Sequence, residues 1–217
     1  MGVLYTKRCV LCRELLPAAG TGKAMLCSAC AAEVRQRYRC TQAPHVTGAD
    51  DAAAALYYTG KVRDAMQWFK FQHKQHYADW LAAQMLPLLA EQMDTWQPDL
   101  VTFMPIGWLR GRERGYNQAE LLARAVAGPL GLPCRATLRK RAFTPKQSEQ
   151  KDAAARQKNA ERAFLPLANA GVRGQSVVLV DDIVTTGATA AAAVRLLHEM
   201  GAAKVYVLAA AYTGQKR

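Results

Sequence analysis

Two neighbouring carboxylates and a run of hydroxyl-bearing residues form the part of the sequence best suited to binding chemistry. Asp181 and Asp182 directly follow the continuously apolar run Val177 to Val180, which is typical of a strand covered on both faces. A small-residue loop then opens a helix: Thr185, Thr186, Gly187, Ala188 and Thr189. Backbone N–H groups, hydroxyls and a helix N-terminus suit a phosphate, and carboxylates can accept hydrogen bonds from sugar hydroxyls or hold Mg²⁺ through water. The run predicts a site for a phosphorylated ribose, against the alternative that Asp182 and Thr186 only cap the helix.

Four cysteines form a second group with recognisable spacing. Two Cys-x-x-Cys pairs, Cys9 with Cys12 and Cys27 with Cys30, are separated by fourteen residues. Four thiolates on two such turns can surround Zn²⁺ tetrahedrally. The spacing predicts a structural zinc ribbon, because a redox-active pair is expected at the start of a helix beside a βαβ unit.

The net charge of the chain indicates which chemical class of binding partner to expect. The 217 residues include 29 Lys and Arg against 17 Asp and Glu, a net charge of +12 at pH 7. Residues 101–165 alone hold thirteen Lys and Arg against five Asp and Glu. Such a basic segment indicates a polyanionic partner, either phosphates or nucleic acid, unless it is a solvated surface that only keeps the protein soluble.

Composition excludes several classes of protein. A hydrophobic fraction of 51% with 21% charged residues is globular, not disordered and not that of a coiled rod. No apolar run approaches the roughly 20 residues that a membrane helix requires, and the first residues lack the apolar region of a secretory signal. We therefore expect a cytoplasmic protein without membrane insertion, whose cysteines are metal ligands or free thiols rather than disulfides.

Apolar patterning predicts the elements that must position these residues. Three apolar runs predict strands: residues 100–104, 177–180 and 204–209. Periodic patterns predict helices: residues 61–72, 76–91, 117–126 and 190–200. We expect Pro87 to kink or break its helix, Asn117 to cap one and Gly201 to end another.

Strands that alternate with helices predict an α/β fold with an open, mostly parallel sheet flanked by helices. We expect this domain to cover residues 46–217. The zinc-ribbon module would cover residues 1–45, with its boundary near Gln42-Ala43-Pro44.

The run from Val177 to Thr189 resembles the 5-phosphoribosyl-1-pyrophosphate (PRPP) signature of the type I phosphoribosyltransferases. The four-cysteine module and the run from Arg112 to Leu122 narrow the resemblance to the competence protein F (ComF) family, and it extends over almost the whole chain. Residues 61–71, 104–106 and 156–164 also look like blocks of that family.

The resemblance implies roles for individual residues. Asp181 and Asp182 would bind the ribose 2′- and 3′-hydroxyls, and the Thr185–Thr189 loop would bind the 5-phosphate, with Mg²⁺ accompanying PRPP. The loop after Ile106 would face the pyrophosphate, where three arginines are candidate anion contacts: Arg110, Arg112 and Arg114. Many members of the family carry a further cysteine pair, of which only Cys40 is present here, so the resemblance does not support a second zinc site.

The resemblance leaves enzyme and binding functions open. A phosphoribosyltransferase would displace pyrophosphate from C1 of PRPP with a nitrogenous base, mainly through orientation and electrostatic stabilisation. A non-catalytic factor of DNA uptake and natural competence would instead bind single-stranded DNA along the basic segment. Alternatively, it would dock competence or recombination proteins through the zinc ribbon.

Overall fold

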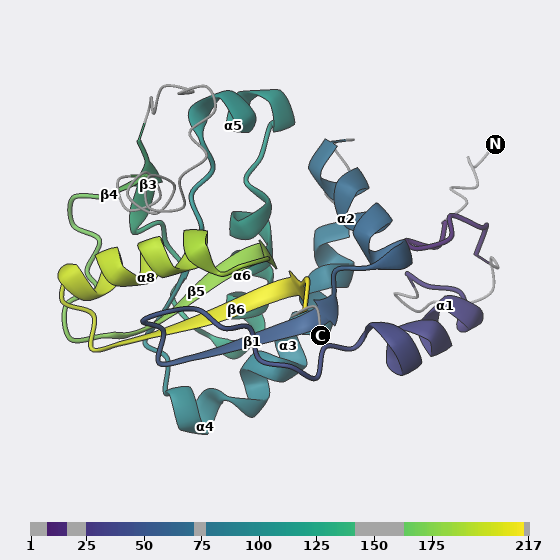
Figure 1. The fold of residues 1–217 in the computed structure, drawn as a ribbon, viewed down its shortest axis with the longest axis horizontal. Coiled ribbons are helices and arrows are strands. Elements are labelled where there is room, and N and C mark those ends of the chain that lie inside the picture. Colours follow the sequence, from purple (N-terminus) through teal and green to yellow (C-terminus); the bar gives the residue numbers. More distant parts are fainter. Residues whose placement is uncertain (1–7, 17–24, 72–76, 142–162, 215–217) are drawn as a thin grey trace.

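A parallel sheet of four strands forms the centre of the molecule, in a computed structural model that describes residues 8–16, 25–71, 77–141 and 163–214. The strands lie in the order β1, β6, β5, β2, with these bounds: β1 (Asp51–Tyr57), β6 (Lys204–Tyr212), β5 (Ser176–Val184) and β2 (Leu100–Phe103). The arrowheads of β5 and β6 show that their carboxyl ends lie at one edge of the sheet (Figure 1). The predicted open parallel α/β sheet is confirmed.

Helices cover both faces of the sheet. Helices α3 (Tyr77–Glu91) and α6 (Gln118–Ala127) pack on each other and on one face, and α8 (Ala188–Glu199) packs on the other (Figure 1). Residues 177–180 of β5 are completely buried as a result. This double cover explains why the strands read as continuous apolar runs rather than as alternating ones.

The remaining elements lie around the edges of the sheet. Helices α2 (Gly60–Phe71) and α5 (Trp108–Arg114) lie towards the carboxyl ends of the strands (Figure 1). The short helices α4 (Met93–Trp96) and η2 (Gly128–Leu130) each precede an extended segment of the chain. Strands β3 (Leu138–Lys140) and β4 (Phe164–Pro166) form a separate antiparallel pair, which the sequence patterning did not predict.

The N-terminal segment joins the same hydrophobic core. It contains α1 (Ser28–Glu33) and the π-helix η1 (Val34–Tyr38), and several of its apolar residues are buried with those of the sheet. Arg39 forms an antiparallel bridge with Leu56, so this segment is attached to the outer edge of β1. The boundary expected near residue 45 stays a prediction.

Two details of the predicted elements can be compared with the structure. Helix α3 continues through Pro87, so the expected alternative of a break there is wrong, and the alternative of a kink stays a prediction. Pro87 and Ala83, whose carbonyl loses its N–H partner, are both exposed, so water can take the place of the missing bond. Strand β5 extends to Val184, so the two aspartates lie within the strand and not beyond its end. Pairing with β6 explains this extension, because Asp181 faces Ala209 in register.

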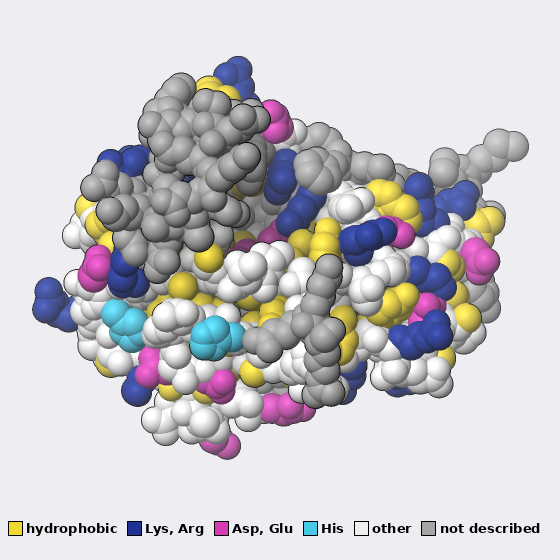
Figure 2. Space-filling model, in the orientation of Figure 1, with side chains coloured by type: hydrophobic (Ala, Val, Ile, Leu, Met, Phe, Trp, Pro, Cys, Tyr) yellow, Lys and Arg dark blue, Asp and Glu magenta, His cyan; other side chains and the backbone are white. Residues whose placement is uncertain are grey.

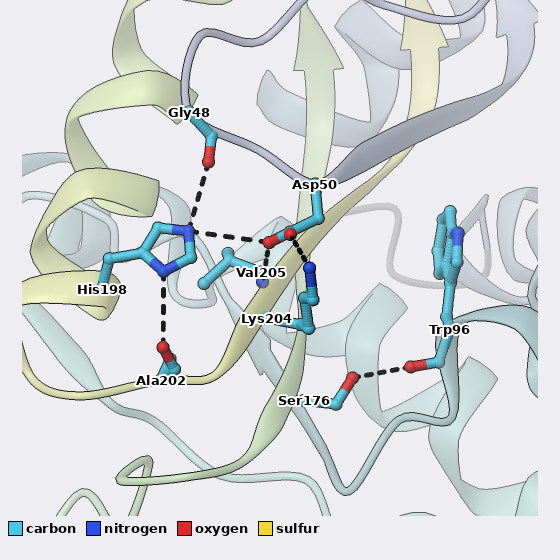
Figure 3. A network of polar contacts seen from close by, with 8 residues as sticks. All are labelled: Gly48, Asp50, Trp96, Ser176, His198, Ala202, Lys204 and Val205. Atoms are coloured by element: carbon cyan, nitrogen blue, oxygen red, sulfur yellow. Dashed lines mark hydrogen bonds and ion pairs between the residues drawn. The ribbon is translucent and has the colours of Figure 1, made fainter.

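A polar network fixes the amino-terminal edge of the sheet, opposite to α2 and α5 (Figure 3). Asp50 accepts hydrogen bonds from Lys204 Nζ at 2.7 Å and from the backbone N–H of Val205 at 2.8 Å. His198 Nε2 lies 3.7 Å from the same carboxylate. The start of β6, the segment before β1 and the end of α8 are thereby joined.

Candidate functional site

A pocket of about 220 Å³ lies where β2 and β5 end. Seven elements or loops contribute to its lining: α2, the β2–α5 loop, α5, α6, the β3–β4 pair, β5 and α8. Figure 2 shows a hollow in this region between α5 and α2, with acidic side chains inside it and Lys and Arg side chains along its rim. In open α/β sheets, ligands bind at this edge.

Strand β5 carries both predicted carboxylates into the pocket. Asp181 Oδ1 accepts the backbone N–H of Asp182 at 2.8 Å, and Asp182 Oδ1 accepts that of Ile183 at 2.7 Å. Burial raises the pKa of Asp181 well above its usual range, and the neighbouring charge of Asp182 raises it further. Two acidic groups that cannot both ionise freely are suited to accepting hydroxyl donors or a cation.

An ion pair with a distant element balances this charge. Lys70 Nζ lies 2.7 Å from Asp182 Oδ2, and the two side chains are only 20% and 16% exposed. Lys70 is near the carboxyl end of α2, and it also lines the pocket. The residue pattern did not identify Lys70 as part of a site. A signal was present, because Lys70 follows the buried residues Val62 and Met66 at helical spacing and is a charged residue on the buried side of the helix.

The predicted phosphate loop connects β5 to α8. Thr189 lines the pocket, whereas Thr185, Thr186, Gly187 and Ala188 are not among the residues that line it. Gly187 caps α8 with a left-handed φ of +78°, and a Cβ there would lie 2.3 Å from the carbonyl oxygen of His45. The loop therefore packs against the segment before β1, and only glycine fits at its turn.

The three predicted arginines have different positions. Arg114 lines the pocket, and its Nη1 donates to Gln118 Oε1 at 3.0 Å. Arg112 lies over the ring of Trp108, 5.4 Å from its centroid. Arg110 is in α5, but its side chain lies outside the described part of the structure. The structure thus places one of the three arginines with the carboxylates.

Helix α6 contributes a residue that the sequence reasoning missed. Gln118 is 2% exposed and lines the pocket, and its Nε2 has no hydrogen-bond partner among the described residues. Gln118 lies on the same buried helical stripe as Leu122 and Val126, so a polar residue on that stripe was the signal available in the sequence. Asn117 caps this helix as predicted and also donates to the carbonyl of Met104 at 3.0 Å, which fixes the β2–α5 loop at the pocket.

The four predicted cysteine ligands come together in the N-terminal segment. Their sulfur atoms all lie within 4.8 Å of one another, and Cys12 Sγ is 3.7 Å from Cys27 Sγ. With Zn–S bonds of about 2.3 Å, the edge of a tetrahedral four-thiolate site is about 3.8 Å, so the group can hold a metal ion. Cys40 and Cys134 belong to no comparable group in the described ranges.

The pKa values of two cysteines in this group are shifted in opposite directions. Burial raises the pKa of Cys9, but hydrogen bonds from the backbone of Cys12, Cys27 and Leu11 outweigh it and lower the pKa to about 7. Burial and its cysteine neighbours raise the pKa of Cys30. Four thiols this close cannot all ionise without a cation, which fits a metal-binding role.

The chain is similar over nearly its full length to curated proteins. It is 31% identical to the DNA utilization protein YhgH of Salmonella typhimurium, across 92% of this chain and 94% of that protein. It is 28% identical to competence protein F of Haemophilus influenzae, across 94% of this chain and 96% of that protein. The chain belongs to the competence protein F family.

Residues 114–217 of the chain match the family model of the phosphoribosyl transferase domain. Among solved structures, the chain is 25% identical to the allosteric regulatory enzyme of purine biosynthesis, with a TM-score of 0.42 over 62% of this chain and 26% of that one. The matched domain includes β5, the Thr185–Thr189 loop and α8, so most residues that line the candidate pocket belong to it. Among the described residues, no helix combines the length and the apolar character needed to cross a membrane.

Proposed function

We propose that this protein binds PRPP or a closely related phosphoribosyl ligand, with Mg²⁺, in the pocket at the end of β5. The observation that carries the proposal is the pair Asp181 and Asp182, which β5 presents side by side in a pocket that also contains Arg114 and Thr189. The carboxylates are the acceptors that a ribose diol needs, and Arg114 is a donor suited to pyrophosphate.

Each part of the ligand has matching groups on the protein. Asp181 and Asp182 accept hydrogen bonds from the 2′- and 3′-hydroxyls. Thr189 contacts the 5-phosphate from the lining of the pocket, and the other residues of the Thr185–Thr189 loop are further candidates for this contact. Arg114 contacts the pyrophosphate, with Arg110 and Arg112 as further candidates on α5. Bound Mg²⁺ supplies further neutralisation of the pyrophosphate charge.

The same arrangement supports displacement of pyrophosphate. A nitrogen nucleophile attacks C1, the C1–O bond breaks with its electron pair leaving on pyrophosphate, and the nitrogen then loses its proton to water. The carboxylates hold the sugar in position and favour the positive charge that develops at C1, while Arg114 favours the growing negative charge on the leaving group. No covalent role for a protein side chain is required.

Calorimetric titration of PRPP, with and without Mg²⁺, tests the binding proposal. We expect Mg²⁺-dependent binding to the wild type that weakens at least about 100-fold in the Asp181→Asn/Asp182→Asn variant, because both carboxyl groups that would hold the ribose diol are lost. Asp94→Asn, an exposed aspartate of α4, is the matched control and should bind like the wild type. Absence of binding by folded wild-type protein would overturn the proposal.

We further propose that the four cysteines hold a structural Zn²⁺ and that the protein acts in DNA uptake and natural competence. The close group of sulfurs supports the first part, and the names of two relatives, "DNA utilization protein" and "competence protein F", support the second. Metal analysis of purified protein should give one zinc per chain, and none in a Cys9→Ser/Cys27→Ser variant. A gene deletion should reduce uptake or use of DNA, and a gene carrying Asp182→Asn should not restore it.

Exposed aromatic surface favours a second candidate function, binding of single-stranded DNA. Trp108 and Leu109 on α5 are each 66% exposed, and Arg112 lies against the Trp108 ring. An exposed indole beside arginines can stack on a base while the cations contact phosphates. Binding of an oligonucleotide should weaken steeply with salt and should weaken further in Trp108→Ala, whereas it should persist in Asp181→Asn/Asp182→Asn.

A further inference from the structure

Helix α2 supplies the candidate ribose site with a cation from outside the matched phosphoribosyl transferase domain. Lys70 Nζ is 2.7 Å from Asp182 Oδ2, and both side chains are largely withdrawn from water. A lysine side chain that is 20% exposed and paired this closely is more constrained than a surface ion pair. The ion pair between Lys70 and Asp182 is therefore a fixed part of the pocket lining.

Several contacts fix α2 relative to the rest of the molecule. At its start, Lys61 Nζ lies 2.6 Å from Glu33 Oε2 of α1. Near its end, Phe69 is completely buried, and its carbonyl accepts a hydrogen bond from the hydroxyl of Tyr116. The backbone of Lys70 is thus held in place, and its four-carbon stem is the part that can move.

The position of Lys70 conflicts with the proposed role of Asp182. A lysine ammonium is a donor with no acceptor, so it can pair with a carboxylate but cannot coordinate a metal ion or accept from a hydroxyl. While Lys70 occupies Oδ2, that oxygen is less available to a divalent cation or to a ribose hydroxyl. Phosphate oxygens of a ligand that enters the pocket would be new, negatively charged acceptors for the ammonium.

We propose that Lys70 exchanges partners on ligand binding: it leaves Asp182 Oδ2 for a phosphate oxygen of the phosphoribosyl ligand, and before that exchange it competes with divalent cations for Asp182. The inference rests on the proposed function for its second half, the contact with the ligand. Its first half, competition between the ammonium and a cation, depends only on the observed ion pair.

The proposal predicts changes of opposite sign in one variant. In Lys70→Ala, Asp182 is freed, so binding of Mn²⁺ (used as a probe for Mg²⁺) without PRPP should tighten about fivefold to tenfold, as expected for removing a close cation. Binding of PRPP at saturating Mg²⁺ should weaken about tenfold or more, because a charge-assisted hydrogen bond is lost. Mn²⁺ affinity can be measured by electron paramagnetic resonance and PRPP affinity by calorimetry.

Two further variants control the experiment. Lys70→Arg keeps the charge, so it should restore most of the PRPP affinity and most of the competition with Mn²⁺. Lys204→Ala removes a lysine that pairs with Asp50 at the same distance of 2.7 Å but at the opposite edge of the sheet, and both affinities should match those of the wild type. Thermal unfolding of each variant shows whether it is folded.

Each outcome decides between the two proposals. Unchanged affinities in Lys70→Ala, or a parallel loss of both that Lys70→Arg does not restore, would overturn the partner exchange and make Lys70 purely structural. If the wild type binds no PRPP but Mn²⁺ binding still tightens in Lys70→Ala, the proposed function fails while the competition at Asp182 holds. If Lys70→Ala does not fold, Lys70→Gln is measured in its place. We expect the same two results for it, tighter binding of Mn²⁺ and weaker binding of PRPP.

Discussion

The guanidinium carbon of Arg13 lies 4.9 Å from the ring centroid of Trp68 and connects the cysteine cluster to helix α2. Arg13 directly follows Cys12, and its left-handed φ of 66° arises in the turn where its N–H donates to the carbonyl of Cys9. The shape of this turn therefore determines where the arginine points. Two residues further along α2 is Lys70, so the cluster and the pocket share one helix.

Removal of the proposed Zn²⁺ should consequently disturb the carboxyl end of α2, where Trp68 and Lys70 lie. Chelation is expected to lower the melting temperature, to change the fluorescence of Trp68 and to weaken PRPP binding. Arg13→Ala should keep its metal and lose only about 0.5–1 kcal/mol of unfolding free energy, the range for an exposed cation–π contact. Metal analysis and thermal unfolding check the effect of chelation and that of Arg13→Ala. A metal-free protein with an unchanged melting temperature would contradict the coupling between the cysteine cluster and α2.

Gly187→Ala should be severely destabilising. The new Cβ would meet the carbonyl oxygen of His45 at 2.3 Å in a left-handed conformation, so backbone must move; we expect a loss of about 2–4 kcal/mol in unfolding free energy. Gly174→Ala has a similar φ of +72° but nothing within 4 Å of its new Cβ, so about 1–2 kcal/mol is expected there. Equal losses in chemical denaturation would show that the contact with His45 is unimportant.

Asp181→Asn should stabilise the protein at neutral pH in the absence of divalent cations. Burial and the charge of Asp182 raise the pKa of Asp181, so the folded protein keeps this proton at pH values where the unfolded chain has lost it. Its contribution to stability is present below the unfolded pKa of about 3.9 and is lost as the pH rises through the folded value. Denaturation curves from pH 4 to pH 8 should therefore decline less steeply for Asp181→Asn than for the wild type, and Asp94→Asn should follow the wild type.

Asp50 should show the opposite dependence on pH. Burial raises its pKa, but hydrogen bonds from Lys204 and the backbone of Val205 outweigh that effect, and the pKa is lowered overall. The stabilisation is thus present above the unfolded pKa of about 3.9 and is lost as the pH falls through the lower folded value. Asp50→Asn should cost about 1–2 kcal/mol at pH 7, and its difference from the wild type should shrink towards pH 3. A constant difference across this range, measured by denaturation, would argue against the network in Figure 3 as the cause.

The sequence predicted β2, β5 and β6 because these strands are covered on both faces, but it did not predict β1, whose residues form an Ala-rich stretch. Residues 177–180 and 205–209 are hydrophobic and buried, so they were predicted as strands, and Gly201 marked the end of α8 because a left-handed turn favours glycine. Strands β3 and β4 have three residues each, which is too short for any periodicity to be detected. Their pairing depends on the tertiary contacts and not on a local pattern.

The residue pattern alone predicted the candidate site only where its residues are neighbours in the chain, and Arg114 was predicted through the family resemblance. Asp181, Asp182 and Thr189 lie in one continuous run, and they meet in the pocket. Lys70 reaches the same pocket from α2, a helix far away in the sequence, so no spacing rule could connect it with Asp182. The arginines of α5 show the converse: they are close in sequence, but Arg112 lies on Trp108 while Arg114 lines the pocket.

The position of β6 has a consequence for how the protein is made. This strand comes last along the described chain, yet it lies between β1 and β5 and pairs with both. During synthesis, β1 leaves the ribosome long before its principal partner, so the centre of the sheet cannot close until β6 has been translated. We expect the nascent chain to expose apolar strand surface for most of its synthesis and therefore to depend on chaperones that shield such surface.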